Sequence, residues 1–475
     1  MRQFSPRLRP GFDPRRTRFG WFLARKVRFL SSGFSLVEVL VAMVVGMITV
    51  VVIMQTLSTV EAQRRQSSGG SSAGTAGAIA LQTMQRDLLS AGAGMTGDTN
   101  TLFTTCYAQQ FLAFNSQRTA TNITLPVGTF APVRVWSSDN PPAHLNAAGG
   151  GGFDTDTDMI QIISGGSSFF AGKGIDVGTF NQPIDVDHSG VSGGVGDSRW
   201  NPFPGLHSGD MVVAVQPNTD CVLGQITAIS VQGRNVVGEY TNATQPGACG
   251  VGPANAARCD APVACATAAA RIDHRGAANF RNFYNDCLQV PPSPWNNSAS
   301  PSLGVAFTTA KLYSLGSIDS LSVRAYAIRS GSLTVCSPLY QDCTQAAEWQ
   351  VYGDGIVSMR AQMGYDADNS EAVAAGEWLN PADFNALGVT VAWRQLKAVR
   401  LVLVARGKDI SRTPVDGADC APVWAGYDTV DAACAAGADD GKVRLISGYD
   451  GGNWNRYRYK VFETTVQMRN LFWSL

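Results

Sequence analysis

The sequence predicts an α+β protein in which a long N-terminal helix precedes a large β-rich head. One apolar run, residues 34–54, is long enough to cross a bilayer. After this run the chain contains many short apolar stretches bounded by glycine, proline, asparagine and aspartate, a pattern typical of β-strands. Only 16% of the 475 residues are charged and 45% are hydrophobic, which excludes a disordered, highly charged chain.

The first 33 residues form a basic leader. They contain nine basic side chains and one acid, Asp13, for a local net charge of +8. Because the formal net charge of the whole chain is zero, the remainder carries −8. A basic segment before an apolar run is typical of export or of membrane orientation, since positive flanks stay on the cytoplasmic side.

The apolar run at 34–54 predicts a membrane helix. A helix rises about 1.5 Å per residue, so these 21 residues span roughly 30 Å, the hydrocarbon thickness of a bilayer. Its one charged residue, Glu38, costs about 2.5–3.5 kcal/mol in a membrane, so we expect it to have a partner. The alternative is an acid near the membrane edge that reaches back to water.

The helix is expected to continue beyond the membrane through 55–90, and the head to occupy 91–475. The segment 67–77 reads SSGGSSAGTAG, has poor helix propensity, and is expected to be flexible or kinked. Helical periodicity resumes at 78–89, where Leu81, Met84 and Leu88 share one face.

Seven runs in the head are expected to be strands, and three long irregular segments are expected to be loops. The strands are 158–163, 211–216, 222–229, 321–329, 351–363, 396–405 and 457–468. The loops are 137–156, 182–208 and 241–303.

All ten cysteines follow the apolar run, and none forms a Cys-x-x-Cys pair. An even number on an exported side predicts disulfides in an oxidising compartment, although some could be buried free thiols. Two pairs are close enough in sequence to be local crosslinks, Cys336 with Cys343 and Cys420 with Cys434.

Motifs that could indicate an enzyme are weak, and no enzyme activity or cofactor is expected. The G-x-G-x-x-G at 92–97 follows a helix, whereas nucleotide binding needs it after a strand. No strong strand precedes the G-x-S-x-G at 190–194. The four histidines are scattered, so no catalytic metal is indicated. The aromatic and basic residues at 454–459 fit a strand better than a nucleic-acid surface, and no nucleic acid is expected.

Two acidic loops could bind calcium, or could be solvated turns. They are Asp154, Asp156 and Asp158, and separately Asp366, Asp368, Asn369 and Glu371. Neither has the spacing of an EF-hand.

The junction at 31–42, SSGFSLVEVLVA, resembles the class III signal of type IV prepilins and related pseudopilins. The resemblance implies cleavage between Gly33 and Phe34 by the prepilin peptidase, N-methylation of Phe34, and an assembly role for Glu38, which pairs with the terminal ammonium of a neighbouring subunit. The 33-residue leader is longer than in many prepilins, so the true start could lie downstream, near Val27.

Further segments resemble the PilW family of minor pilins: RDLLSAGAG at 86–94, GDMVV at 209–213, LYSLG at 312–316, VRAYAI at 323–328 and RYRYKVFETTVQMRN at 456–470. This resemblance implies a type IV pilin-like α+β fold, in which the helix packs on an antiparallel β-sheet with large disulfide-bearing loops. It also implies a minor pilin that initiates type IV pilus assembly at the filament tip, held in the inner membrane with a periplasmic head. The implied partners are other minor pilins, the major pilin, the prepilin peptidase and the assembly platform. The alternatives are a type II secretion pseudopilin and a tip adhesin.

Overall fold

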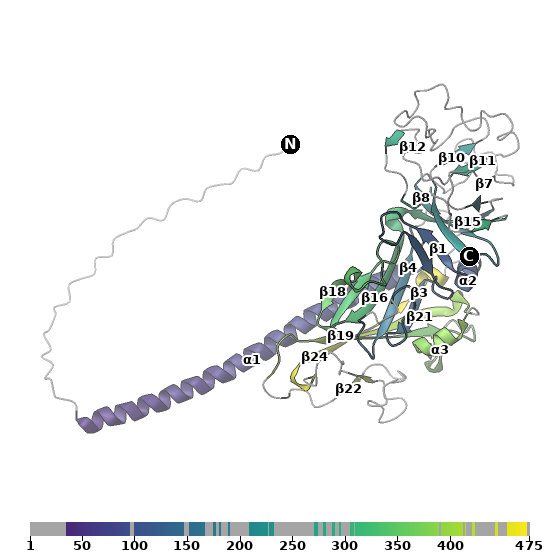
Figure 1. Ribbon diagram of the computed structural model, residues 1–475. Helices are drawn as coiled ribbons and strands as arrows, with labels where there is room; N and C mark the ends of the chain where they lie inside the picture. The colour runs from purple at the N-terminus through teal and green to yellow at the C-terminus, as the bar shows by residue number, and fades with distance from the viewer. Residues whose placement is uncertain are drawn as a thin grey trace, which may run out of the picture. The chain divides into compact units, whose positions relative to one another are not determined.

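A computed structural model describes a helix and a set of β-sheets (Figure 1). The described residues are 35–95, 99–146, 152–166, 209–226, 305–388 without 308, 391–411 and 454–472, with short pieces at 174–176, 180–181, 189–190, 228–231, 270–273, 279–281, 287–289, 294–295, 414, 420–422 and 442–444. The chain divides into two units, Met1–Glu61 and Ala62–Leu475.

Helix α1 runs without interruption over Leu36–Ser90. The expectation of a flexible or kinked segment at 67–77 is therefore wrong. Ala73 and Gly77 are buried at helical spacing with Ala80, Met84 and Leu88. This face of the helix, which lies within the second unit, is therefore part of the core of that unit. These tertiary contacts override the low helix propensity of the glycines and serines. Leu81, expected on the same face, is only partly buried.

The G-x-G motif at 92–94 ends α1. Gly92 and Gly94 have φ of 70° and 75°, which glycine adopts without steric cost. The backbone N–H of Gly92 donates to the carbonyl of Ile163 at 2.8 Å, which fixes the exit of the chain against a strand. The motif is a helix C-terminal cap, as its position after a helix indicates.

Three larger sheets form the head. The first has six strands in the order β2-β1-β9-β8-β15-β5, and is antiparallel except for the parallel pair β1 and β9. Its strands are β1 Phe111–Phe114, β2 Asn122–Leu125, β5 Ile175–Asp176, β8 Asp210–Val215, β9 Cys221–Gln225 and β15 Lys311–Ser317.

The second sheet has five antiparallel strands in the order β18-β17-β16-β4-β3. They are β3 Val133–Ser137, β4 Asp158–Ser164, β16 Ser322–Arg329, β17 Ser332–Cys336 and β18 Gln350–Asp354. The third has four antiparallel strands, β20-β19-β21-β24. They are β19 Ile356–Tyr365, β20 Trp378–Leu379, β21 Leu396–Arg406 and β24 Tyr459–Gln467.

Short elements complete the described head. The helices are α2 Thr99–Ala108, α3 Pro381–Ala386 and α4 Arg469–Phe472. One three-stranded sheet, β10-β11-β7, and three pairs, β12-β13, β14-β6 and β22-β23, contain the remaining short strands. These are β6 Phe180–Asn181, β7 Ser189–Gly190, β10 Ala228–Val231, β11 Ala270–Asp273, β12 Asn279–Arg281, β13 Cys287–Gln289, β14 Ala306–Phe307, β22 Cys420–Pro422 and β23 Lys442–Arg444.

The α+β fold class is confirmed, and each expected strand appears, two of them divided. The run 351–363 is split into β18 and β19 at Gly355, whose φ is 80°. The run 222–229 is split between β9 and β10. Strands β4 and β19 are buried along their whole length, as the centre of a two-sided core requires.

Two disulfides lie in the described residues. Cys106 of α2 bonds to Cys221 of β9, and Cys336 of β17 bonds to Cys343. The local crosslink expected between Cys336 and Cys343 is confirmed. The other expected crosslink, Cys420 with Cys434, lies outside the described residues because Cys434 is not among them. The loop 241–303 and the serine of the G-x-S-x-G motif lie largely or wholly outside them as well.

Candidate functional site

The N-terminal segment of α1 is the first candidate functional site. Gly33 and Phe34, the predicted cleavage residues, lie outside the described residues, which begin at Ser35. The carbonyl of Ser35 accepts hydrogen bonds from the backbone N–H groups of Glu38 (2.9 Å) and Val39 (3.2 Å), and so begins the helix. Glu38 therefore lies in the first helical turn, where the helix dipole favours a negative charge.

The segment Leu36–Glu61 is long and apolar enough to cross a membrane, and it is the one such segment in the part of the chain that the structure describes. Its valine, leucine, isoleucine and methionine side chains are exposed all round, with Leu36 79% and Met47 74% exposed. Thr49 and Thr56 donate their hydroxyls to helix carbonyls four residues earlier, so these polar groups suit an apolar medium.

Further along α1, one carboxylate is held by the head. Asp87 accepts a hydrogen bond from the Tyr326 hydroxyl and two from Arg324 Nη1, at 3.2 and 3.0 Å. Both donors lie on β16. Burial, and then the hydrogen bond to Asp87, raise the pKa of Tyr326, so Tyr326 stays protonated and donates. Tyr352 of β18 donates a hydrogen bond to Oγ1 of Thr83, which lies one helical turn before Asp87 in α1.

The last turn of α1 is held by the other end of the chain. Asn470 of α4 donates its side-chain amide to the carbonyls of Leu89 (3.0 Å) and Ala91 (3.1 Å). These carbonyls belong to the end of the helix, where acceptors lack intrahelical partners. The two sequence motifs at 86–94 and 456–470 therefore meet in space, a contact that no local pattern could predict.

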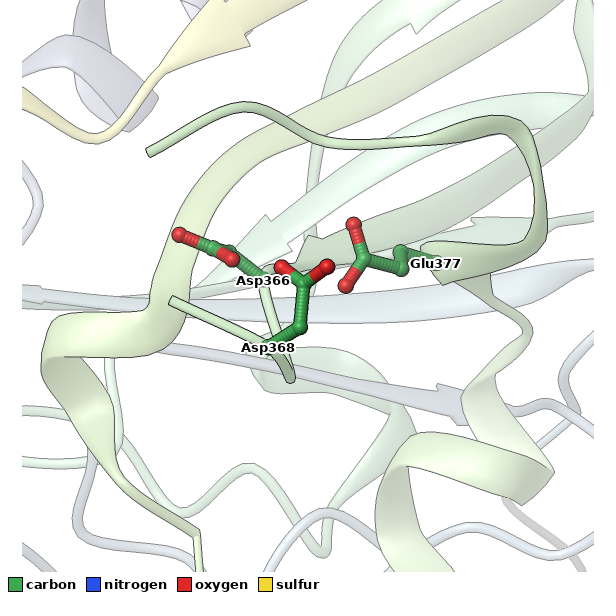
Figure 2. Close-up of side chains that lie close together, drawn as sticks. All are labelled: Asp366, Asp368 and Glu377. Carbon is green, nitrogen blue, oxygen red and sulfur yellow. The ribbon is translucent and has the colours of Figure 1, made fainter. Parts of the chain in front are cut away.

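A group of three carboxylates lies beyond the end of β19 (Figure 2). Asp366, Asp368 and Glu377 each place a carboxylate oxygen within 4.8 Å of the others. The expected loop contained Asp366 and Asp368 but not Glu377, which lies in the 3₁₀ turn Ala375–Glu377. The expected ligands Asn369 and Glu371 serve differently, since Asn369 accepts from Gln395 and the Glu371 backbone donates to Asp366.

These carboxylates already have partners in the loop. Asp366 accepts from the backbone N–H groups of Ser370 (2.9 Å) and Glu371 (3.0 Å) and forms an ion pair with Lys397. Glu377 accepts from the backbone N–H groups of Ala367 and Ala374. The carboxylates of Asp366 and Glu377 therefore hold the loop in place by accepting hydrogen bonds from its backbone. The cluster does not by itself indicate a metal ion.

The second acidic loop does not converge on one point. Asp154 accepts from the backbone N–H groups of Ser330 and Gly331, and so caps the β16–β17 turn. Asp158 is 3% exposed and pairs with Arg360 Nη1 at 3.2 Å and the Ala361 backbone N–H at 2.8 Å. Burial raises the pKa of Asp158 while Arg360 opposes that shift. The pair joins β4 of one sheet to β19 of another.

Two family models match the chain. One, described as type IV pilus-assembly protein W, matches residues 326–470, and the other, the prokaryotic N-terminal methylation motif, matches residues 28–54. No curated protein matches the chain, and no solved structure does. The resemblances to PilW and to the prepilin-type signal are thus confirmed. The PilW match begins at Tyr326 and ends at Asn470, two of the residues that donate hydrogen bonds to the C-terminal part of α1.

Proposed function

We propose that this chain is a minor pilin that initiates type IV pilus assembly from the filament tip. One observation carries the proposal: the methylation motif at 28–54 covers the start of an exposed apolar helix whose C-terminal end is held by residues of the PilW match. A single helix thus carries the methylation-motif match at its start and is bonded near its C-terminal end by residues of the PilW match. The function is assembly, and it needs no catalytic group.

The assembly step centres on residues 33–38. Cleavage after Gly33 would leave a new ammonium at Phe34, a few residues before Glu38 in the sequence. The ammonium of Phe34 and the carboxylate of Glu38 both lie at the start of the apolar segment. An unpaired charge is costly in the membrane, so an arrangement that pairs each carboxylate with an ammonium is favoured. In the proposed step, Glu38 of one subunit pairs with the Phe34 ammonium of its neighbour. An incoming subunit with the wrong register would leave a carboxylate unpaired in the membrane.

The tip position is supported by the size of the head. Residues 91–475 form most of the chain. At any position below the tip of a filament, the head of a subunit must leave room for the subunit stacked above it. Only the tip has no subunit above it, so a large head fits there without excluding its neighbours. The partners in this proposal are other minor pilins and the major pilin in the filament, and the prepilin peptidase and assembly platform in the inner membrane.

The location follows from the same features. The apolar segment with its basic leader fits an inner-membrane anchor with a periplasmic head. The disulfides Cys106–Cys221 and Cys336–Cys343 fit an oxidising compartment. After assembly, the proposed location of the subunit is the pilus at the cell surface.

Deletion of this chain, with surface pili counted and protein secretion assayed in the same cells, tests the proposal. We expect the loss of most surface pili with normal secretion, restored by the wild-type chain and not by a Glu38→Ala chain. The reverse phenotype, normal pili with failed secretion, would identify a type II secretion pseudopilin. Normal numbers of pili with lost attachment would identify a tip adhesin that is dispensable for initiation.

A further inference from the structure

Arg134 is a buried cation without a described anionic partner. It lies in the middle of β3 and is 4% exposed. Three aromatic rings surround its guanidinium, with ring centroids 5.1 Å (Tyr107), 5.6 Å (Trp136) and 5.8 Å (Phe384) from Cζ. Its hydrogen-bonding partner is the Tyr107 hydroxyl. No carboxylate among the described residues forms an ion pair with it.

The cluster of side chains that contains Arg134 and Trp393 has unused hydrogen-bond donors. Nε and Nη1 of Arg134 are buried and have no hydrogen-bond partner. The indole N–H of Trp393 is also buried and unpartnered. The Trp393 ring lies against the same two rings as Arg134, 5.2 Å from Tyr107 and 6.2 Å from Phe384. Since Tyr107 accepts from Arg134, its own hydroxyl hydrogen is a further donor at this place.

Neutral acceptors nearby do not balance this charge. Asn385 Oδ1, next to Phe384, and His144 Nδ1, whose ring is 6.1 Å from Trp136, are buried and unpartnered. An amide oxygen or a neutral imidazole can accept a hydrogen bond, but neither supplies a negative charge. Aromatic faces offset only part of the desolvation of a guanidinium, and buried charges in proteins are paired as a rule.

We propose that Arg134 binds a small monovalent anion of halide size through Nε and Nη1 inside the head. The ligand neutralises the guanidinium and occupies donors that the protein leaves unused. The site is structural and independent of pilus assembly. The donor-only character of Arg134 selects an anion, and its single positive charge is matched by a singly charged ion, whereas doubly charged phosphate or sulfate would leave a buried negative charge unpaired.

Thermal unfolding of the detergent-solubilised full chain tests this proposal, with sodium chloride replaced by sodium gluconate at constant ionic strength. A ligand that binds only the folded state stabilises it as its concentration rises above Kd. We expect the melting temperature to rise with the logarithm of the chloride concentration once that concentration exceeds Kd. Arg134→Met should abolish the rise. Arg400→Met is the matched control, because Arg400 also stacks on a ring, Trp378 at 3.6 Å, but has Glu463 nearby, and it should keep the rise.

A second measurement covers the case in which Arg134→Met does not fold. Line broadening of the chloride-35 NMR signal by the wild-type chain should decrease when bromide competes, and should be weaker by several fold for Arg134→Lys, which keeps the charge but loses the planar fork. A wild-type melting temperature that does not change with chloride would overturn the proposal. So would a chloride response or line broadening that Arg134→Met or Arg134→Lys leaves unchanged, since the ion would then bind elsewhere.

Discussion

Asp87 joins α1 to the head through three hydrogen bonds. Its carboxylate accepts from Arg324 and Tyr326, and the side chain of Asp87 is only 15% exposed. A hydrogen bond to a charged group contributes more than one between neutral groups, because the charged partner gains more from a donor when water is excluded. Tyr326 therefore fixes the helix to β16 more strongly than Tyr352 fixes it to β18.

Replacing Tyr326 with Phe tests this difference. We expect Tyr326→Phe to lower the free energy of unfolding by about 1.5–3 kcal/mol, because Asp87 loses a donor in a half-buried place. The matched control is Tyr352→Phe, which removes a bond to the neutral Thr83 hydroxyl from a ring that is 41% exposed. It should cost only about 0.5–1.5 kcal/mol. Urea unfolding of the full chain in detergent measures both, and equal losses would contradict the assigned role of Asp87.

His144 is held neutral in the head. Gln161 donates its amide to the Thr129 carbonyl, so its oxygen is left to accept from His144 Nε2 at 2.8 Å. The proton of the neutral ring is thereby assigned to Nε2. Burial lowers the pKa of His144 from 6.5 to about 4, and the hydrogen bond with Gln161 opposes that shift.

This pKa predicts how stability changes with pH. In the unfolded chain His144 gains a proton below about pH 6.5, whereas in the folded chain it stays neutral until about pH 4. The free energy of unfolding should therefore fall as the pH falls through this window, by up to roughly 3 kcal/mol from this residue, with no further loss below it. Urea unfolding of wild type and His144→Gln at several pH values measures the difference. Parallel pH curves would contradict the assignment.

Among the elements, α1 depends on small residues where it approaches β24. A Cβ atom built on Gly77 would lie 2.2 Å from Phe462 Cε2, so glycine permits the close approach of this ring. Gly70, two turns earlier in the same helix, has nothing within 4 Å of such an atom. The same residue type thus serves packing at one position and weakens the helix at the other.

A pair of alanine substitutions separates these two effects. Gly77→Ala should destabilise the chain by about 1–3 kcal/mol, because Phe462 must move within a packed region. Gly70→Ala should stabilise it by about 0.5–1 kcal/mol through helix propensity alone. The free energy of unfolding of both variants is compared with wild type. A stabilising Gly77→Ala would show that the ring and the helix are not packed as described.

Local sequence patterns predicted the elements whose signal is periodic or continuous. The apolar run, the face with Met84 and Leu88, and strands such as β4 and β21 belong to this group. The helicity of 67–77 could not be predicted, because it depends on contacts with β24, nearly four hundred residues away in sequence. Helix α2 was missed because TNTLFTTCYA is rich in threonine and lacks a clear helical pattern.

The candidate sites show the same division. Glu38 was predicted from sequence because it is the one charge in an apolar run, and its role in assembly stays a prediction. Glu377 was missed in the acidic cluster because it enters through a turn nine residues beyond Asp368. The sequence offered no capping-box signature for it, because the residue three before Glu377 is Ala374 and not serine or threonine, although the Glu377 carboxylate accepts from the Ala374 backbone N–H.

For the chain as a whole, the zero net charge conceals two oppositely charged parts. In the proposed function the +8 leader is removed at the cytoplasmic face, and an acidic subunit that begins at Phe34 works outside. Cleavage and assembly then depend on different residues. In this proposal Gly33 must fit the peptidase, whereas Glu38 acts only after the cut.

Variants of these two residues should therefore fail at different steps. Gly33→Leu should leave the full-length precursor in the membrane, with no mature chain. Glu38→Ala should be cut normally but enter filaments at least tenfold less, since a lost charge pair of about 1.4 kcal/mol or more corresponds to that factor. Immunoblots of membrane and sheared pilus fractions measure both. Equal failure of cleavage in the two variants would contradict separate roles.

Mass spectrometry of the N-terminus of the chain extracted from membranes tests the proposed processing most directly. The account predicts a mature chain that begins at an N-methylated Phe34, retains the apolar helix and contains 442 residues, the 475 of the full sequence without the 33 of the leader. A chain that keeps its leader, or one cut after the apolar run, would contradict it.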